Sequence, residues 1–207
     1  MSALIIGLTG GIASGKSVAT AAFEARGITV ADADLAARDA VAPGSAGLAE
    51  VVEAFGTDAL NVDGHLDRAA MRRRIFEDPR ARRRLEAIIH PRVRRMLREA
   101  CEAATSAYAV AAIPLLAEGG RDAYPWLHRV LVIDVPADVQ MARLQARDGI
   151  DVALAARMVA AQASRDARLA IADDVLVNDG TLEALDTGVA ALDARYRELA
   201  SAASPQA

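Results

Sequence analysis

The chain has 207 residues, 53% hydrophobic and 25% charged, and its 24 basic and 28 acidic side chains give a formal net charge of -4. This composition is that of a globular protein and excludes a mainly disordered chain. The first apolar run stops at Leu8, too short for a membrane span of roughly 20 residues, and it lacks the basic start of a signal peptide. The single cysteine, Cys101, excludes an internal disulfide. We therefore expect a cytoplasmic protein that does not bind membranes.

Residues 3–17 predict a phosphate-binding loop. Residues 3–8 are a short apolar run, typical of a strand buried in a parallel sheet, and residues 18–26 are an Ala-rich helical stretch. Between them, residues 10–17 read GGIASGKS and fit the G-x-x-x-x-G-K-[ST] pattern of a P-loop. The backbone N–H groups of such a loop, and the start of the following helix, both point at a bound polyphosphate. The nucleotide-binding residues predicted from it are Gly11, Ile12, Ala13, Ser14, Gly15, Lys16, Ser17 and Val18.

Lys16 is the only lysine, so the other 23 basic residues are arginines. A compact ammonium on a slim stem fits where the wide guanidinium does not, which singles out this position in the loop. We expect Lys16 to reach the β and γ phosphates and the Ser17 hydroxyl to ligate Mg²⁺.

A P-loop alone leaves GTPase switches, motor ATPases and small-molecule kinases open. The Asn-Lys-x-Asp pattern of GTPases needs a second lysine, which this chain lacks. A motor ATPase would carry an apolar run ending in an acid, as residues 130–134 do, but no Leu-Ser-Gly-Gly-Gln segment is present. For Asp134 the alternative is that it simply ends a buried strand.

Two aspartates, Asp32 and Asp34, follow the second apolar segment at residues 27–30. Ligands gather at the carboxyl ends of parallel strands, so this acidic pair should lie near the phosphate site. One aspartate is expected to face the nucleotide, where it could accept a hydroxyl proton or hold Mg²⁺ through water. The other could cap a helix that begins near Leu35. Two capping aspartates remain the alternative.

Over nearly its whole length the chain resembles the dephospho-CoA kinase family. The shared segments, in order, are LTGGI at 8–12, GKS at 15–17, DAD at 32–34, AR at 37–38, FG at 55–56, Gly64, RIF at 74–76, HP at 90–91, PLLAE at 114–118, QASR at 162–165 and ADD at 172–174. Two positions depart from the family pattern: Ala13 stands where glycine is usual and Val18 where threonine is common. Because alanine disfavours a positive φ, we expect a slight adjustment of the loop at Ala13.

The resemblance implies phosphorylation of the ribose 3′-hydroxyl of dephospho-CoA by ATP with Mg²⁺, the last step of coenzyme A biosynthesis. It implies a three-layer α/β P-loop kinase fold with a five-stranded parallel sheet, in a single domain. The core would comprise residues of about 1–43, 105–147 and 173–207, the helical substrate-binding insertion about 44–104 and the lid about 148–172. Asp34 would be the base by the same resemblance. The partners would be ATP and dephospho-CoA, without nucleic acid.

Two stretches are expected to bind the acceptor. Pro91 disfavours helix at His90, so we expect a joint between two helices there. His90 would then either contact substrate, as the resemblance suggests, or bond to the backbone of the joint. Pro114 ends a third buried strand, which would place Pro114, Leu115 and Glu118 along the acceptor pocket.

The arginines allow two interpretations. Residues 72–98 carry many of them, which suits a nucleic-acid surface, but aromatics make up only 3% of the chain and its net charge is negative. Solvated helix faces, with a few arginines clamping an anionic substrate, fit better. Arg143 is the first choice for a lid arginine on the phosphates, ahead of Arg147 and Arg165, and a surface ion pair is the alternative for each. Residues 178–180 would form either an adenine contact or a simple turn.

Residue types also indicate helix ends. Ser45 and Asp67 are expected to cap two helices of the insertion, and Gly56 is expected to end the first of them. Residues 201–207 are expected to form a frayed tail after a long helix.

Overall fold

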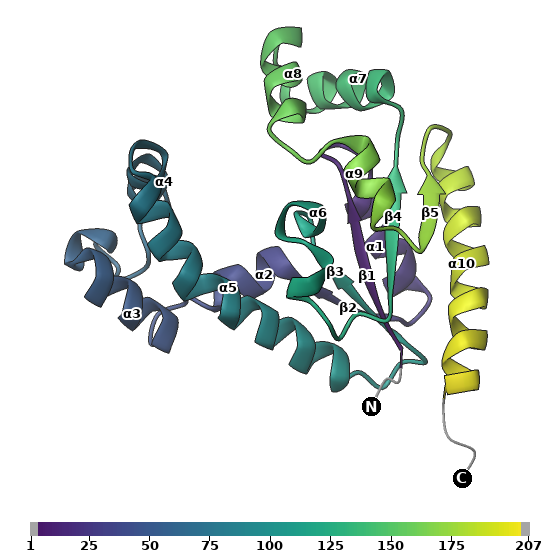
Figure 1. The fold of residues 1–207 in the computed structure, drawn as a ribbon, viewed down its shortest axis with the longest axis horizontal. Helices are drawn as coiled ribbons and strands as arrows, with labels where there is room; N and C mark the ends of the chain where they lie inside the picture. The colour runs from purple at the N-terminus through teal and green to yellow at the C-terminus, as the bar shows by residue number, and fades with distance from the viewer. Residues whose placement is uncertain (1–3, 204–207) are drawn as a thin grey trace. The chain divides into compact units, whose positions relative to one another are not determined.

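The structure of the protein is a computed structural model that describes residues 4–203 (Figure 1). The first residue of the predicted strand 3–8 and the last four of the tail predicted over 201–207 lie outside this range. The chain divides into two compact units: unit 1 is Met1–Ala31 with Ala100–Ala207, and unit 2 is Asp32–Glu99. The expected boundaries of core, insertion and lid stay predictions.

A five-stranded parallel sheet flanked by helices confirms the predicted α/β fold. The strands are β1 (Ile5–Gly10), β2 (Thr29–Asp32), β3 (Ala109–Ala112), β4 (Arg129–Asp134) and β5 (Asp174–Val177), in the order β2-β3-β1-β4-β5. β1 is central and pairs in parallel with β3 and β4. Because Gly10 pairs with Ile133, the chain leaves β1 level with the end of β4. The phosphate loop therefore starts beside Asp134.

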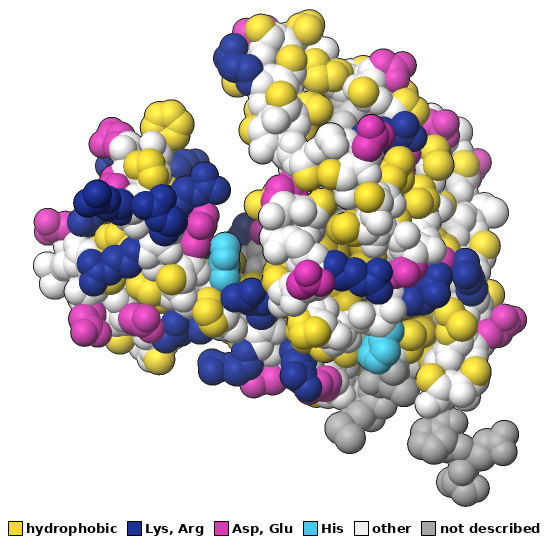
Figure 2. Space-filling model, viewed as in Figure 1, with side chains coloured by type: hydrophobic (Ala, Val, Ile, Leu, Met, Phe, Trp, Pro, Cys, Tyr) yellow, Lys and Arg dark blue, Asp and Glu magenta, His cyan; other side chains and the backbone are white. Residues whose placement is uncertain are grey.

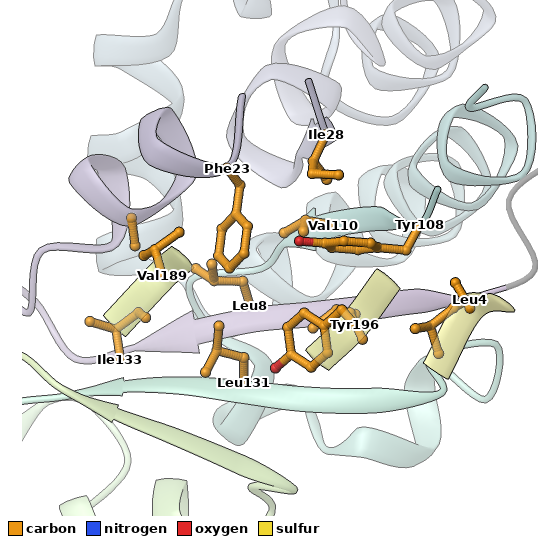
Figure 3. Packing of buried hydrophobic residues seen from close by; sticks show 13 residues of the cluster. Leu4, Leu8, Phe23, Ile28, Tyr108, Val110, Leu131, Ile133, Val189 and Tyr196 are labelled. Atoms are coloured by element: carbon orange, nitrogen blue, oxygen red, sulfur yellow. The ribbon is translucent and has the colours of Figure 1, made fainter. Parts of the chain in front are cut away.

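The core of unit 1 lies between the sheet and helices α1 (Lys16–Ala25) and α10 (Leu182–Ala203) (Figure 3). Phe23 of α1 and Tyr196 of α10 are fully buried, and the Tyr108 ring meets both edge-on, with centroids 6.3 and 5.4 Å apart. Burial raises the pKa of both tyrosines, so they stay neutral donors. The Tyr196 hydroxyl donates to Asp174 Oδ2 at 3.0 Å, which ties α10 to β5.

The remaining helices of unit 1 follow β3 and β4. They are α6 (Leu116–Gly119), the short 3₁₀ turn η2 (Arg121–Ala123), α7 (Ala137–Asp148), α8 (Val152–Ala160) and α9 (Arg165–Ala170). Gly149, at φ 65°, ends α7 in the left-handed conformation that glycine favours, and the Asp151 and Ser164 side chains cap α8 and α9. The stretch predicted as a lid is therefore mainly two short capped helices joined by residues 161–164.

Unit 2 consists of helices and short turns. They are α2 (Ala33–Asp39), α3 (Ala46–Phe55), the 3₁₀ turn η1 (Thr57–Ala59), α4 (Arg68–Glu77) and α5 (Pro79–Glu102). Ser45 and Asp67 cap α3 and α4 as predicted, and Gly56, at φ 84°, ends α3. A separate apolar cluster, which includes Val51 and Phe55, packs these helices together.

The predicted joint at His90 is wrong, because α5 runs without interruption from Pro79 to Glu102. Pro91 lacks an N–H and costs a helix interior about 3 kcal/mol. However, Ile88, Val93 and Leu97 are all buried, and each contributes about 1.5–3 kcal/mol, so continuing the helix through Pro91 is favourable. Arg92 Nη1 also donates to the Ile88 carbonyl at 2.6 Å in the same turn.

The tail predicted to begin at Ser201 is wrong for residues 201–203, which continue α10. The Ser201 hydroxyl donates to the Arg197 carbonyl one turn earlier, at 2.9 Å. No helix within residues 4–203 combines the length and apolar character needed to cross a membrane.

Candidate active site

The phosphate loop connects β1 to α1 in the predicted order of strand, loop and helix. β1 ends at Gly10, and α1 begins at Lys16 directly after Gly15, whose φ of 92° requires glycine. A Cβ at Gly15 would also collide with Asn178 Nδ2. The loop therefore turns tightly into the start of a helix, where unpaired N–H groups can receive phosphate oxygens.

Ala13 holds an unusual backbone conformation in this loop. Its φ is 57°, in the left-handed region, and no other described residue except glycine has a positive φ. That conformation costs an alanine about 1–2 kcal/mol. The loop has thus kept the backbone that glycine would favour, and the surrounding structure must hold it.

Two glutamine side chains form hydrogen bonds with the backbone of Ile12, next to Ala13, and we call this arrangement the Ile12 clamp. Gln140 Nε2, on α7, donates to the Ile12 carbonyl at 2.7 Å, and the Ile12 N–H donates to Gln162 Oε1 at 2.7 Å. Gln140 is buried, 128 residues away in the chain, and Gln162 is 150 residues away. The clamp fixes the backbone next to Ala13 and joins the loop to the segment around α7 and α8. No motif in the sequence indicates a role for Gln140.

Lys16 extends back along the loop. Its Nζ donates to the carbonyl oxygens of Gly10 and Gly11 at 2.6 and 2.8 Å. An ammonium fits between two carbonyls this close, whereas a planar guanidinium would spread beyond them. The geometry explains in physical terms why lysine stands at this one position.

The turn after β5 reaches the phosphate loop. Asn178 is buried, and its Nδ2 donates to the Ser14 carbonyl at 2.8 Å. Arg143 Nη1, from α7, donates to the Asn178 carbonyl at 2.7 Å. Arg143, predicted to contact phosphates, is therefore bonded to the β5 turn in this structure.

Asp134 ends β4 and is paired with Arg165. Its side chain is only 3% exposed, and Arg165 Nε and Nη2 donate to the two carboxylate oxygens, the shortest distance being 2.6 Å. These hydrogen bonds, against the opposing effect of burial, hold the pKa of Asp134 below its ordinary value. The pair fixes the start of α9 to the end of β4, so Arg165 is held in an ion pair as the alternative interpretation allowed.

The residues predicted for the acceptor pocket lie around α6. Glu118 Oε1 accepts from the Ala163 N–H at 2.9 Å, which ties α6 to the loop that carries Gln162. The Pro114 carbonyl accepts from the Thr9 hydroxyl at 3.3 Å, and Leu115 is exposed. These three residues stay a predicted pocket lining.

In unit 2 the structure separates the two aspartates. Asp32 Oδ1 accepts from the backbone N–H groups of Asp34 and Leu35 at 2.7 and 3.1 Å, so Asp32 caps α2. The Asp34 carboxylate is exposed and makes no hydrogen bond with another described residue, and the same holds for the His90 imidazole. Their roles in binding and catalysis stay predictions.

The residues near the loop fit a magnesium ion that arrives with a nucleotide. Ser17 lies in the first turn of α1, and its exposed hydroxyl bonds to no described residue. Within residues 4–203 there is no group of three or more His, Cys, Asp or Glu side chains that could hold a metal. Mg²⁺ is commonly held by one or two protein ligands, substrate phosphates and water, so a lone hydroxyl beside a phosphate loop suits it.

Comparisons with known proteins agree with the resemblance seen in the sequence. The family model for dephospho-CoA kinase matches residues 4–184. A dephospho-CoA kinase of Xanthomonas oryzae pv. oryzae is 56% identical over 198 residues, covering 95% of this chain and 98% of the relative. A crystal structure from Thermus thermophilus, 34% identical, covers 93% of this chain and 97% of its own with a TM-score of 0.77. That of a dephospho-CoA kinase from Campylobacter jejuni, 22% identical, covers 94% and 97% with a TM-score of 0.72, and shows the same fold.

Proposed function

Because the chain belongs to the dephospho-CoA kinase family, we propose that it transfers the γ-phosphoryl group of ATP to the ribose 3′-hydroxyl of dephospho-CoA. The products are coenzyme A and ADP, in the last step of coenzyme A biosynthesis. The observation that carries this proposal is the phosphate loop held by the Ile12 clamp with Lys16 folded along it. A cytoplasmic location and the absence of a nucleic-acid partner belong to the same proposal.

Lys16 and the loop N–H groups bind the phosphates and offset the charge that develops on them during transfer. The Ser17 hydroxyl would help to hold a Mg²⁺ ion that arrives with ATP, and that ion would supply further positive charge at the phosphates. Arg143 contacts the phosphates after exchanging its bond to the Asn178 carbonyl for phosphoryl oxygens. The nucleotide-binding residues are Gly11, Ile12, Ala13, Ser14, Gly15, Lys16, Ser17 and Val18.

On the acceptor side, Asp34 orients the attacking hydroxyl and accepts its proton. Its carboxylate is exposed and without a hydrogen bond to another described residue, so an incoming hydroxyl can bond to it without breaking an existing contact. Since the transition state for phosphoryl transfer is loose, orientation contributes more than deprotonation. His90, Pro114, Leu115 and Glu118 bind the rest of the acceptor.

The test is to measure ADP formation and 3′-phosphorylation of dephospho-CoA in the same reaction. We expect the two to match one for one and ADP formation to stop when dephospho-CoA is omitted. ADP formation that is stimulated by nucleic acid and indifferent to dephospho-CoA would instead favour a P-loop motor ATPase or a nucleic-acid-binding module.

A further inference from the structure

Arg168 is a buried arginine on α9 without an ion-pair partner. It is only 7% exposed, and the one hydrogen bond of its guanidinium to a described residue runs from Nη1 to the Ala163 carbonyl at 2.5 Å. Within residues 4–203 no carboxylate forms an ion pair with it, although its charge helps to lower the pKa of Asp134, which is itself paired with Arg165. A guanidinium has five N–H donors, and removing its charge from water without a counter-charge is unfavourable by several kcal/mol. Such a position is stable in the presence of an anion.

The Arg168 guanidinium lies against the start of the phosphate loop. A Cβ at Gly11 would lie 3.0 Å from Arg168 Nη2 and 2.5 Å from Gln140 Nε2, so any larger residue there would displace these side chains. The Gly11 carbonyl also accepts from Lys16 Nζ at 2.8 Å. Two cations, Lys16 and Arg168, therefore adjoin the same residue of the loop.

The free donors of Arg168 are within reach of a ligand. Across the described part of the chain, Ser14 Oγ is the only fully enclosed side-chain nitrogen or oxygen without a hydrogen-bond partner. The N–H groups of Arg168 that lack a partner are therefore not sealed in the interior. Arg165 and Arg143, in contrast, are engaged with Asp134 and with the Asn178 carbonyl.

We infer that Arg168 is a catalytic residue that donates to phosphoryl oxygens of the nucleotide at the loop, opposite Lys16. The inference rests on the proposed function, because it deepens the account of the same site. Two N–H groups of one guanidinium can bond two phosphoryl oxygens side by side, and this interaction strengthens as negative charge grows on them. Because no carboxylate within residues 4–203 forms an ion pair with Arg168, its remaining N–H donors are available for that purpose.

The experiment compares Arg168→Ala with wild type and with Arg26→Ala, which removes an arginine paired with Asp186 at the other end of α1. We expect Arg168→Ala to lower kcat by at least about 10²-fold, the cost of losing one preorganised donor. Guanidinium ion added at millimolar concentration should restore part of that activity, and sodium at equal ionic strength should not. Arg26→Ala should keep wild-type kcat and show no response to guanidinium.

Arg168→Lys separates a phosphate contact from a role in holding Ala163. A point charge keeps part of the electrostatic effect, so its kcat should lie between those of wild type and Arg168→Ala. Normal kcat in Arg168→Ala, or a loss that guanidinium leaves untouched, overturns the inference. Should Arg168→Ala not fold, a folded Arg168→Lys with wild-type kcat and KM would overturn it equally. Wild-type protein that phosphorylates no dephospho-CoA would instead refute the proposed function.

Discussion

The two units use their arginines differently. In unit 1 most arginines are paired with carboxylates, as Arg129 and Arg195 are with Asp174. In unit 2 the visible arginines gather over α4 and α5 (Figure 2), and many of them have no carboxylate partner among the described residues. Those without an ion pair include Arg72, Arg73, Arg80, Arg83 and Arg94. In unit 1 the arginines are thus mainly neutralised by nearby carboxylates, whereas we expect an anionic acceptor to offset the unpaired arginines of α4 and α5.

The two units also differ in which residues form hydrogen bonds with their backbone polar groups. Around the phosphate loop, backbone groups are bonded by side chains that come from distant parts of the chain, such as Gln140 and Asn178. In unit 2 most hydrogen bonds are local caps, such as those of Ser45 and Asp67. Substitutions of these distant side chains should therefore disturb the phosphate loop, whereas substitutions of the caps in unit 2 should mainly lower the stability of single helices.

The largest effect is expected at Lys16. Lys16→Ala should lower kcat by at least about 10²-fold with the fold intact, because one positioned cation is lost from the phosphate site. Lys16→Arg should fail as well, since the carbonyls of Gly10 and Gly11 accept a single nitrogen at 2.6 and 2.8 Å. Steady-state kinetics with circular dichroism as the folding control checks both variants. Near-normal turnover by Lys16→Arg would contradict our interpretation of the only lysine.

The second prediction contrasts the two aspartates at the start of unit 2. Asp34→Asn should lower kcat by about 10²-fold through loss of a general base or orienting group, with little change in ATP affinity. Asp32→Ala should instead lower the free energy of unfolding by about 1 kcal/mol, because it removes the cap of α2. Urea unfolding and single-turnover kinetics on both variants separate the effects. A reversed result would mean that Asp32 is the reacting carboxylate.

The third prediction concerns pH and the buried carboxylate of unit 1. Burial opposes ionisation of Asp174, but hydrogen bonds from Arg129 and Tyr196 and the charge of Arg195 outweigh it, and its pKa is lowered from 3.8. A lowered folded-state pKa stabilises the protein above about pH 4, and this stabilisation is lost as the pH falls below that value. Asp174→Asn should therefore reduce the free energy of unfolding by about 2 kcal/mol at pH 7 and by less below pH 4.

Denaturant unfolding at several pH values checks this, with Asp63→Asn as the matched control. Asp63 is exposed in a loop of unit 2, and its carboxylate bonds to no described residue. Asp63→Asn should leave the dependence of the free energy of unfolding on pH unchanged. If the free energy of unfolding of Asp174→Asn differed from that of wild type by the same amount down to pH 3, the assigned ionisation of Asp174 would be contradicted.

Local patterns predicted much of this molecule. Apolar runs located the strands of the sheet, and the P-loop pattern located the loop, because both depend on neighbouring residues. Ser45, Asp67 and Gly56 marked helix ends for the same reason. The local rule failed at Pro91, where burial of distant side chains outweighed the cost of proline in a helix.

Long-range polar contacts could not be predicted from the sequence. Gln140 bonds to Ile12 across 128 residues, and Asn178 bonds to Ser14 across 164. No spacing or periodicity in the sequence links the two partners of either hydrogen bond. They meet only because β4 and β5 lie on the same side of β1 in the sheet. Arg168 was missed for a related reason, since nothing in its neighbouring sequence shows that it is buried.

The smallest effect is expected at Ala13, and it tests whether the Ile12 clamp holds the loop. Ala13→Gly removes the steric cost of φ 57°, about 1–2 kcal/mol, but adds freedom to the unfolded chain worth about 0.5–1 kcal/mol. The net gain in stability should be about 0.5 kcal/mol, with unchanged ATP affinity, because the clamp already imposes the conformation. Isothermal calorimetry and urea unfolding measure the two quantities.

The sharper test combines this substitution with loss of the clamp. In Gln140→Ala the Ile12 carbonyl loses its donor, so the strained Ala13 can relax and ATP affinity should fall by about tenfold, the equivalent of one hydrogen bond of about 1.4 kcal/mol. Adding Ala13→Gly removes the strain that drives the relaxation, and the double variant should recover part of the affinity. If Ala13→Gly changed ATP affinity equally with and without Gln140, the two residues would be uncoupled. The left-handed backbone would then be held by the turn from Ser14 N–H to the Gly11 carbonyl alone.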